Sequence, residues 1–197
     1  MIISATILAA GCSSRMEDKN KLLLPFQESL VINQVCNTIL NSGLKPVIVV
    51  TGFEHKKIKK ALPKSIDQII HNPEWEDGMA GSIYAGMSIL PDTVDGNMIV
   101  LGDMPLLTTH ILNPLIEQFC AHDGKQIIYP VYAGQQANPV IFPKKYFNEI
   151  LSSTGDKGCK KVLKQYPDDA VQVLVDSNEV ILDCDTKDDY FRMIEQN

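Results

Sequence analysis

The chain has 197 residues, of which 45% are hydrophobic and 21% charged, a composition that excludes disordered and fibrous classes. A chain of this length is expected to form a single domain over residues 1–197 that buries about 70% of its unfolded surface. The net charge of −6 argues against a nucleic-acid polymer as partner, while a few focused cations and a divalent metal still allow a small anionic substrate. Because no apolar stretch reaches the length of a membrane span and the N-terminus lacks a signal peptide, we expect a cytoplasmic protein without a membrane partner.

The cysteines are dispersed and form no C-x-x-C pair, so neither a disulfide framework nor a structural zinc site is predicted. Reduced thiols are expected throughout. The cysteines are Cys12, Cys36, Cys120, Cys159 and Cys184.

In the first half of the chain, buried strands alternate with helices. Continuous apolar runs predict strands, and apolar residues at helical spacing predict helices. The expected order is a strand at 2–8, a loop at 8–24, a helix at 30–40, a strand at 46–50, a helix at 56–62 and a strand at 68–71.

In the second half, a hairpin interrupts this alternation. The expected order is a helix from 79 to about 90, a strand at 98–101, a helix at 108–120 capped by Thr108, strands at 126–131 and 138–142 joined by a turn, helices at 145–151 and 157–166, and strands at 171–175 and 179–182. Thr186 and Asp189 resemble a capping box for a last helix. This alternation predicts an α/β fold, a three-layer α/β/α sandwich with a mostly parallel, Rossmann-like sheet.

The loop after the first strand reads LAAGCSSRMEDKNKLLL and is expected to bind a nucleoside triphosphate. Small side chains at Ala9, Ala10 and Gly11 let backbone amides approach an anion, and Ser13 and Ser14 add hydroxyl donors. The loop matches neither the Lys-Ser/Thr phosphate loop nor the three-glycine dinucleotide pattern.

Two cations follow in the same loop. The Arg15 guanidinium can hold two phosphate oxygens at once, and the Lys21 ammonium supplies a mobile point charge. Both are candidate phosphate ligands.

Asp103 follows the strand at 98–101 and is expected to face the loop, since parallel strands end on one side of a sheet. A carboxylate there suits Mg²⁺; the alternative is a turn cap. Asp183 or Asp185 is a candidate second metal ligand, although the capping box explains much of that motif. Ser82, near a helix start, is a candidate base or phosphate contact or an N-cap.

Trp75 is the only tryptophan and either touches a ligand or packs at the rim. His71, at the expected end of a strand, is interpreted as structural.

The run LAAG-x-S-x-RM followed by KLLLP resembles the start of the MobA-like nucleotidyltransferases, closest to their molybdenum cofactor cytidylyltransferase branch. Further matching motifs extend the resemblance over nearly the whole chain: VTGF at 50–53, HNPEWEDGM at 71–79, Ser82, LGDMP at 101–105, NPVIF at 138–142, GDKG at 155–158 and DCDT at 183–186.

The resemblance implies transfer of CMP from CTP to the terminal phosphate of molybdopterin, with Mg²⁺ as cofactor and release of pyrophosphate. It implies that Arg15 grips the β and γ phosphates, Lys21 the α phosphate, and Asp103 the metal. Other nucleotide-binding positions would be Leu8, Ala9, Ala10, Gly11, Ser13, Ser14, Ser82 and Gly102, and the acceptor would lie against Asn138, Pro139, Asp156 and Lys157. Ala10 stands where similar guanylyltransferases have glycine, which predicts CTP over GTP.

Two departures lie on the acceptor side: the family's His-Pro is Asn138-Pro139, and its Gly-Ala-Arg is Gly158-Cys159-Lys160. A sugar or alcohol phosphate is therefore an alternative acceptor. A further alternative is a non-catalytic chaperone that delivers finished cofactor to a molybdenum hydroxylase.

Overall fold

The computed structural model describes residues 1–13, 15–16, 20–153, 155 and 159–195. Within them lies an eight-stranded sheet with the order β10-β7-β9-β6-β1-β4-β5, with β8 paired to β7 at the side. The strands are β1 (Ile3–Ala9), β4 (Val47–Thr51), β5 (Gln68–His71), β6 (Gly96–Leu101), β7 (Ile127–Tyr132), β8 (Gln135–Gln136), β9 (Val140–Pro143) and β10 (Ala170–Leu174). Another small sheet pairs β2 (Pro25–Phe26) with β3 (Ser29–Leu30).

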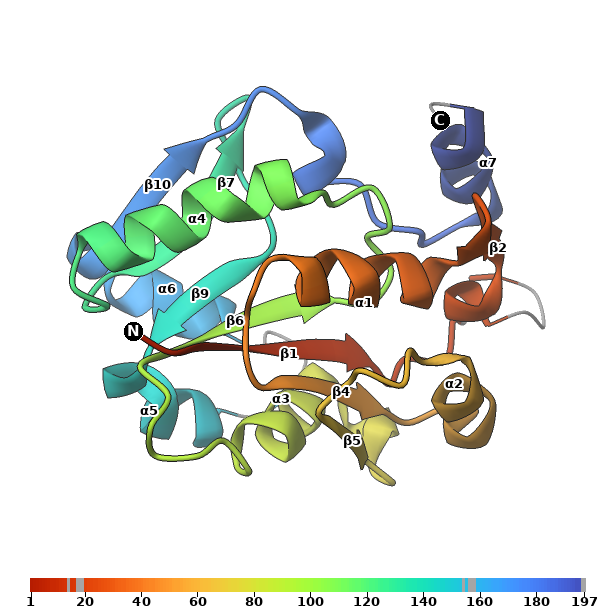
Figure 1. The fold of residues 1–197 in the computed structure, drawn as a ribbon, viewed down its shortest axis with the longest axis horizontal. Coiled ribbons are helices and arrows are strands. Elements are labelled where there is room, and N and C mark those ends of the chain that lie inside the picture. The colour runs from red at the N-terminus through yellow and green to blue at the C-terminus, as the bar shows by residue number, and fades with distance from the viewer. Residues whose placement is uncertain (14, 17–19, 154, 156–158, 196–197) are drawn as a thin grey trace.

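Helices cover both faces of the large sheet, as Figure 1 shows. One face packs against α1 (Val31–Asn41) and α4 (Thr109–Ala121), and the other against α3 (Met79–Met87), α5 (Phe147–Leu151) and α6 (Lys160–Gln165). The remaining helices, α2 (His55–Ala61) and α7 (Lys187–Glu195), lie toward the end of the molecule at which β1 points. The structure therefore confirms the predicted three-layer α/β sandwich.

The parallel strands β1 and β4 are buried on both faces, as is usual for parallel sheets. All residues of β4 are buried, as are all but one of β1, which fits the continuous apolar runs read in the sequence. β1 pairs in parallel with β4 and β6, so the carboxyl ends of these strands lie at one edge.

The predicted hairpin is confirmed, since β9 is antiparallel to β7. β9 also pairs antiparallel with β6, so this strand joins the parallel part of the sheet to the pair β7 and β10. The turn between β7 and β9 contains the short strand β8.

The strand predicted at 179–182 is wrong, because the chain there forms the 3-10 helix η5 (Asn178–Val180). The Ser177 hydroxyl accepts the N–H of Glu179, which starts a helical turn, and the Val180 carbonyl accepts the Asn138 N–H instead of a strand partner. The apolar side chain of Val180 is still fully buried. The sequence therefore predicted the burial of this residue correctly but not its backbone conformation.

Of three predictions about helix ends, the structure corrects two and confirms one. Thr108 stands at the N-cap of α4 but its side chain makes no capping hydrogen bond, and α3 ends at Met87, before Leu90. The capping box is confirmed: the Asp189 carboxylate accepts the Thr186 N–H at 2.9 Å, and the Thr186 hydroxyl accepts the Asp189 N–H at 3.1 Å.

Five short 3-10 segments complete the described chain: η1 (Lys21–Leu23), η2 (Trp75–Asp77), η3 (Lys144–Tyr146), η4 (Pro167–Asp169) and η5. Across the described ranges, no helix is both long and apolar enough to span a bilayer.

Candidate functional site

A crevice of about 450 Å³ lies at the carboxyl ends of β1 and β6. Ligands of open α/β sheets bind at this edge, outside the strand ends. The chain segments that line the crevice are the loop after β1, the start of η1, the segment around η2, the end of β6 and the aspartates before α7. Their lining residues are Leu8, Ala9, Ala10, Gly11, Cys12, Lys21, Leu22, Trp75, Glu76, Gly78, Met79, Leu101, Asp103, Asp183 and Asp185.

Three predicted site residues meet in this crevice. The Lys21 ammonium donates to an Asp103 carboxylate oxygen and to Asp185 Oδ1, the latter at 2.7 Å. Only 14% of the Lys21 side chain and 13% of the Asp103 side chain are exposed. The sequence places these residues 82 positions apart, so the tertiary structure brings the predicted cation and the predicted metal ligand together.

Arg15 lies at the outer side of this cluster. Its Nη1 donates to Asp185 Oδ2 at 2.6 Å, and 67% of its side chain is exposed. A surface ion pair of this kind adds little to stability. Arg15 is therefore free to exchange the carboxylate for a phosphate at low cost in free energy.

On Lys21 and Asp185, burial and neighbouring charges shift the pKa in opposite directions, whereas on Asp183 they act together. Burial lowers the pKa of the Lys21 ammonium, but the charge and hydrogen bond of Asp103, joined by Asp185, raise it above its ordinary value. Burial raises the pKa of Asp185, but the hydrogen bond and charge of Lys21 outweigh it and hold the pKa below the ordinary value. Burial and the neighbouring charges of Asp185 and Asp103 raise the pKa of Asp183.

The residues present fit a hard divalent cation. The Asp103 Oδ1 atom is buried and has no hydrogen-bond partner among the described residues, which is costly unless a ligand satisfies it. Asp185, which also accepts a hydrogen bond from the Lys21 ammonium, supplies a second carboxylate. The described residues contain no group of three or more His, Cys, Asp or Glu side chains preformed for a metal, and Mg²⁺ commonly takes one or two carboxylates, waters and substrate phosphates.

Backbone contacts position Asp103. The Gly102 N–H donates to the Leu8 carbonyl at 2.9 Å, and the Cys184 N–H donates to the Asp103 carbonyl at 2.9 Å. A Cβ on Gly102 would meet the Leu8 carbonyl oxygen at 2.7 Å, so glycine is required for this close approach. Gly102 thus places its neighbours Leu101 and Asp103 in the crevice while it does not line the crevice itself.

The end of β1 and the loop that follows it form part of the lining of the crevice. Leu8, Ala9, Ala10 and Gly11 line it, and a Cβ on Gly11 would meet nothing within 4 Å. The Ser13 hydroxyl accepts the Lys21 N–H at 3.0 Å and holds the loop to η1, and its expected contact as a donor to a phosphate stays a prediction. Ser14 lies outside the described residues.

Ser82 is not an N-cap, because α3 begins at Met79 and Gly78 holds the N-cap position. Its buried hydroxyl accepts a hydrogen bond from the Asn72 amide at 3.0 Å, and it does not line the crevice. The expected nucleoside contact of Ser82 stays a prediction. The hydrogen bond to Asn72 instead ties the start of α3 to the end of β5.

Trp75, for which a ligand contact or rim packing was expected, lines the crevice together with Glu76, which was not predicted. The Phe53 N–H donates to the Ala10 carbonyl at 3.0 Å, and a Cβ on Gly52 would lie 2.5 Å from Trp75 Cβ and 2.7 Å from the Ala10 oxygen. Gly52 therefore allows Trp75 to pack against the loop. The sequence signal for the packing of Trp75 against the loop was a single tryptophan within a glycine-containing segment that follows a strand.

Comparison with known sequences decides the family. The MobA-like NTP transferase domain matches residues 5–171. The chain belongs to this family. It is a nucleotidyltransferase, and its fold is that of the nucleotide-diphospho-sugar transferase type.

Similar proteins cover nearly the whole MobA-like chain. It is 27% identical to molybdenum cofactor cytidylyltransferase of Escherichia coli K12, over 95% of this chain and 93% of that one. It is 30% identical to purine catabolism protein PucB of Bacillus subtilis 168, over 93% and 91% of the two chains. The solved structure of Rv0371c from Mycobacterium tuberculosis H37Rv in complex with manganese superposes with a TM-score of 0.83 at 24% identity, over all of both chains.

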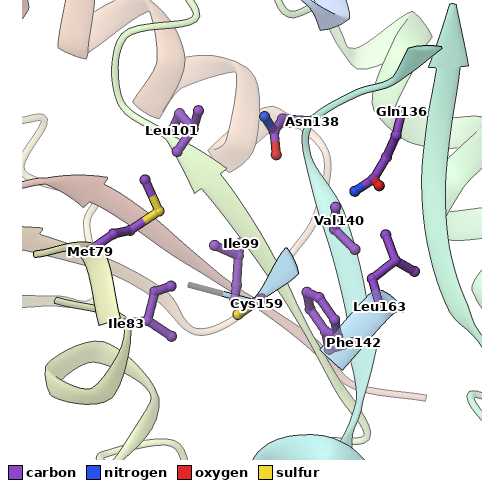
Figure 2. Close-up of a pocket in the computed structure, with 10 residues that line it drawn as sticks. All are labelled: Met79, Ile83, Ile99, Leu101, Gln136, Asn138, Val140, Phe142, Cys159 and Leu163. Carbon is purple, nitrogen blue, oxygen red and sulfur yellow. The ribbon is translucent and has the colours of Figure 1, made fainter. Parts of the chain in front are cut away.

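Of the four residues predicted to lie against a phosphate acceptor, the structure describes Asn138 and Pro139. Asn138 lines a second pocket of about 110 Å³ beside the crevice (Figure 2). Pro139 is buried immediately before β9, and Asp156 and Lys157 lie outside the described residues. The pocket itself was not predicted.

Proposed function

We propose that this MobA-like enzyme transfers CMP from CTP to the terminal phosphate of molybdopterin, with Mg²⁺ as cofactor. The observation that carries the proposal is that Lys21, Asp103 and Asp185 meet in a crevice that is partly lined by small residues. A buried ammonium between two carboxylates, one with a free oxygen, provides ligands for a phosphate and for the metal that neutralises it.

The proposed transfer needs no acid or base from the protein. An oxygen of the acceptor phosphate attacks the α phosphorus of CTP, a new P–O bond forms, and the bond from the α phosphorus to the β-phosphate oxygen breaks. Pyrophosphate takes the electron pair. A phosphate monoester is largely ionised near neutral pH, because its second pKa is about 6, so no general base is needed. Catalysis then rests on in-line positioning and charge neutralisation.

Each cation has a separate task in this proposal. Lys21 exchanges one of its carboxylate partners for an oxygen of the α phosphate, and Arg15, which is mostly exposed, turns from Asp185 to the β and γ phosphates. Asp103 and Asp185 would hold Mg²⁺, which neutralises charge on the departing pyrophosphate when it is bound.

Similarity to the E. coli cytidylyltransferase over 95% of the chain supports CTP and molybdopterin. A related structure that contains manganese supports a divalent ion in this fold. The proposal includes release of the finished cofactor to a molybdenum hydroxylase in the cytoplasm.

The test is pyrophosphate release by purified protein with Mg²⁺, each of the four nucleoside triphosphates, and molybdopterin. We expect release only with molybdopterin present and fastest with CTP. Release with a sugar or alcohol phosphate instead would reassign the acceptor. No release with any acceptor, together with binding of finished cofactor, would favour the chaperone.

A further inference from the structure

The second pocket is apolar, unlike the crevice beside it. Its walls come from α3, β6, β8, β9, Cys159 and α6, and the buried side chains among them include Ile83, Ile99, Phe142 and Leu163. None of the described residues that line it carries a charge. Its amide side chains are those of Gln136 and Asn138, which Figure 2 shows together on one side of the pocket.

The pocket adjoins the crevice. Met79 and Leu101 line both, and Leu101 ends β6 two residues before Asp103. A molecule whose phosphate lies near Asp103 can therefore place its other end in the pocket without a change in the fold.

We propose that this pocket binds the organic part of the phosphate acceptor, and that it selects an uncharged ring with apolar faces whose polar edge bonds to Gln136 and Asn138. This inference rests on the proposed transfer to a phosphate acceptor and adds the chemical class of the group attached to that phosphate.

Desolvation sets the selectivity. A polyol placed here would lose water from several hydroxyls and find only the amides of Gln136 and Asn138 along the described lining, and unpaired polar groups are costly to bury. A ring buries apolar faces against Ile99 and Val140 and needs hydrogen bonds only at its edge. The pocket thus favours ring phosphates over sugar and glycerol phosphates.

Cys159 lines the pocket, and its thiol does not make the pocket reactive. Its side chain is buried, and this burial raises the pKa of the thiol to about 12. The neutral thiol is a weak nucleophile. Cys159 therefore contributes shape, and its side chain can be changed to test the volume of the pocket.

The first experiment measures binding by calorimetry with Mg²⁺ and a non-hydrolysable CTP analogue present. Phenyl phosphate and glycerol phosphate are the probes, since they share the phosphate and differ in the attached group. We expect phenyl phosphate to bind about tenfold more tightly, from burial of the ring faces. Equal affinities would overturn the inference, whatever the natural acceptor is.

Matched variants at Cys159 test the place of binding. Cys159→Leu fills the pocket and should bring the two affinities together, whereas Cys159→Ala keeps the space and should preserve the preference. Circular dichroism and thermal melting check that both variants fold. A preference that survives Cys159→Leu in a folded protein would show that the ring binds elsewhere.

Gln136 and Gln135 offer a control within one strand. Both are exposed residues of β8, and of the two only Gln136 lines the pocket. With molybdopterin as acceptor, Gln136→Ala should raise the acceptor KM roughly five- to tenfold, the effect of one lost hydrogen bond, and leave the CTP KM unchanged. Gln135→Ala should change neither. An unchanged acceptor KM in Gln136→Ala would overturn the edge contact.

The proposed reaction and the proposed pocket assignment can be refuted independently of each other. If molybdopterin yields no pyrophosphate while phenyl phosphate still binds preferentially, the proposed reaction is wrong and the pocket assignment holds. If molybdopterin is a substrate but neither Cys159→Leu nor Gln136→Ala affects its KM, the pocket assignment is wrong and the reaction holds.

Discussion

The crevice and the apolar pocket are neighbours that share Met79 and Leu101, yet they are built in opposite ways. The crevice is lined largely by loop residues that follow strands, and its charged side chains pair with one another across 82 to 170 positions of sequence. The pocket is lined mainly by apolar side chains from the inner faces of strands and helices. The crevice supplies charge, and the pocket supplies shape.

This difference separates two kinds of mutational effect. Changes in the crevice should act on the chemical step, because its charges are needed most where charge develops in the transition state. Changes in the pocket should act on acceptor binding, because apolar contacts hold substrate and transition state alike.

The largest expected effect is that of Asp103→Ala, which removes the buried carboxylate from the crevice. Transfer should fall about a thousandfold or more if Asp103 holds the metal. Pyrophosphate release measures the loss, and thermal melting checks the fold. A folded variant with nearly normal turnover would refute the metal role and strengthen the chaperone alternative.

A smaller effect should distinguish the two cations of the crevice. Lys21→Met is expected to cost about a hundredfold in kcat/KM, since it removes a charge from the least exposed part of the cluster, and Arg15→Lys roughly tenfold, since a lysine cannot hold two oxygens in a fork. Lys64→Ala, an exposed lysine outside the crevice, is the control. Normal activity in Arg15→Lys would mean that Arg15 supplies only diffuse charge.

Base choice should depend on Ala10, which is 6% exposed and lines the crevice. Its methyl group is expected to crowd a purine, so CTP should be preferred over GTP by roughly 10- to 200-fold in kcat/KM. Ala10→Gly should narrow that ratio. Equal use of GTP by the wild type would refute the preference, and an unchanged ratio in Ala10→Gly would refute this explanation of it.

The smallest expected effect compares one thiol from each region. Cys12 is exposed in the crevice, whereas burial raises the pKa of Cys159 in the pocket to about 12. A thiol reagent should therefore modify Cys12 and leave Cys159 unmodified in the native protein, because the thiolate is the reactive form. Bound Mg-CTP should slow modification of Cys12 several-fold and leave that of the exposed Cys120 unchanged. Peptide mapping by mass spectrometry reads all three, and rapid modification of Cys159 would contradict the burial.

The crevice was largely predictable because its signals are local. Small residues after a buried strand and an aspartate after another can be read directly, and parallel strands then place both at one edge of the sheet. Ser82 was less predictable: the helix begins four residues earlier than a capping serine at position 82 would require, and the Ser82 hydroxyl accepts a hydrogen bond from Asn72. The apolar residues within 179–182 likewise indicate burial but cannot distinguish a strand from the 3-10 turn that Ser177 starts.

The sequence alone determined the layered α/β fold, the loop of small residues after β1 and the family resemblance, because hydrophobic periodicity and short motifs are properties of neighbouring residues. Only the tertiary structure decided that Lys21 lies between Asp103 and Asp185, that Trp75 packs over Gly52, and that apolar residues from separate elements leave a pocket beside the crevice. An apolar side chain that lines a pocket has the same sequence pattern as one that fills the core. The space between such side chains depends on how whole elements pack.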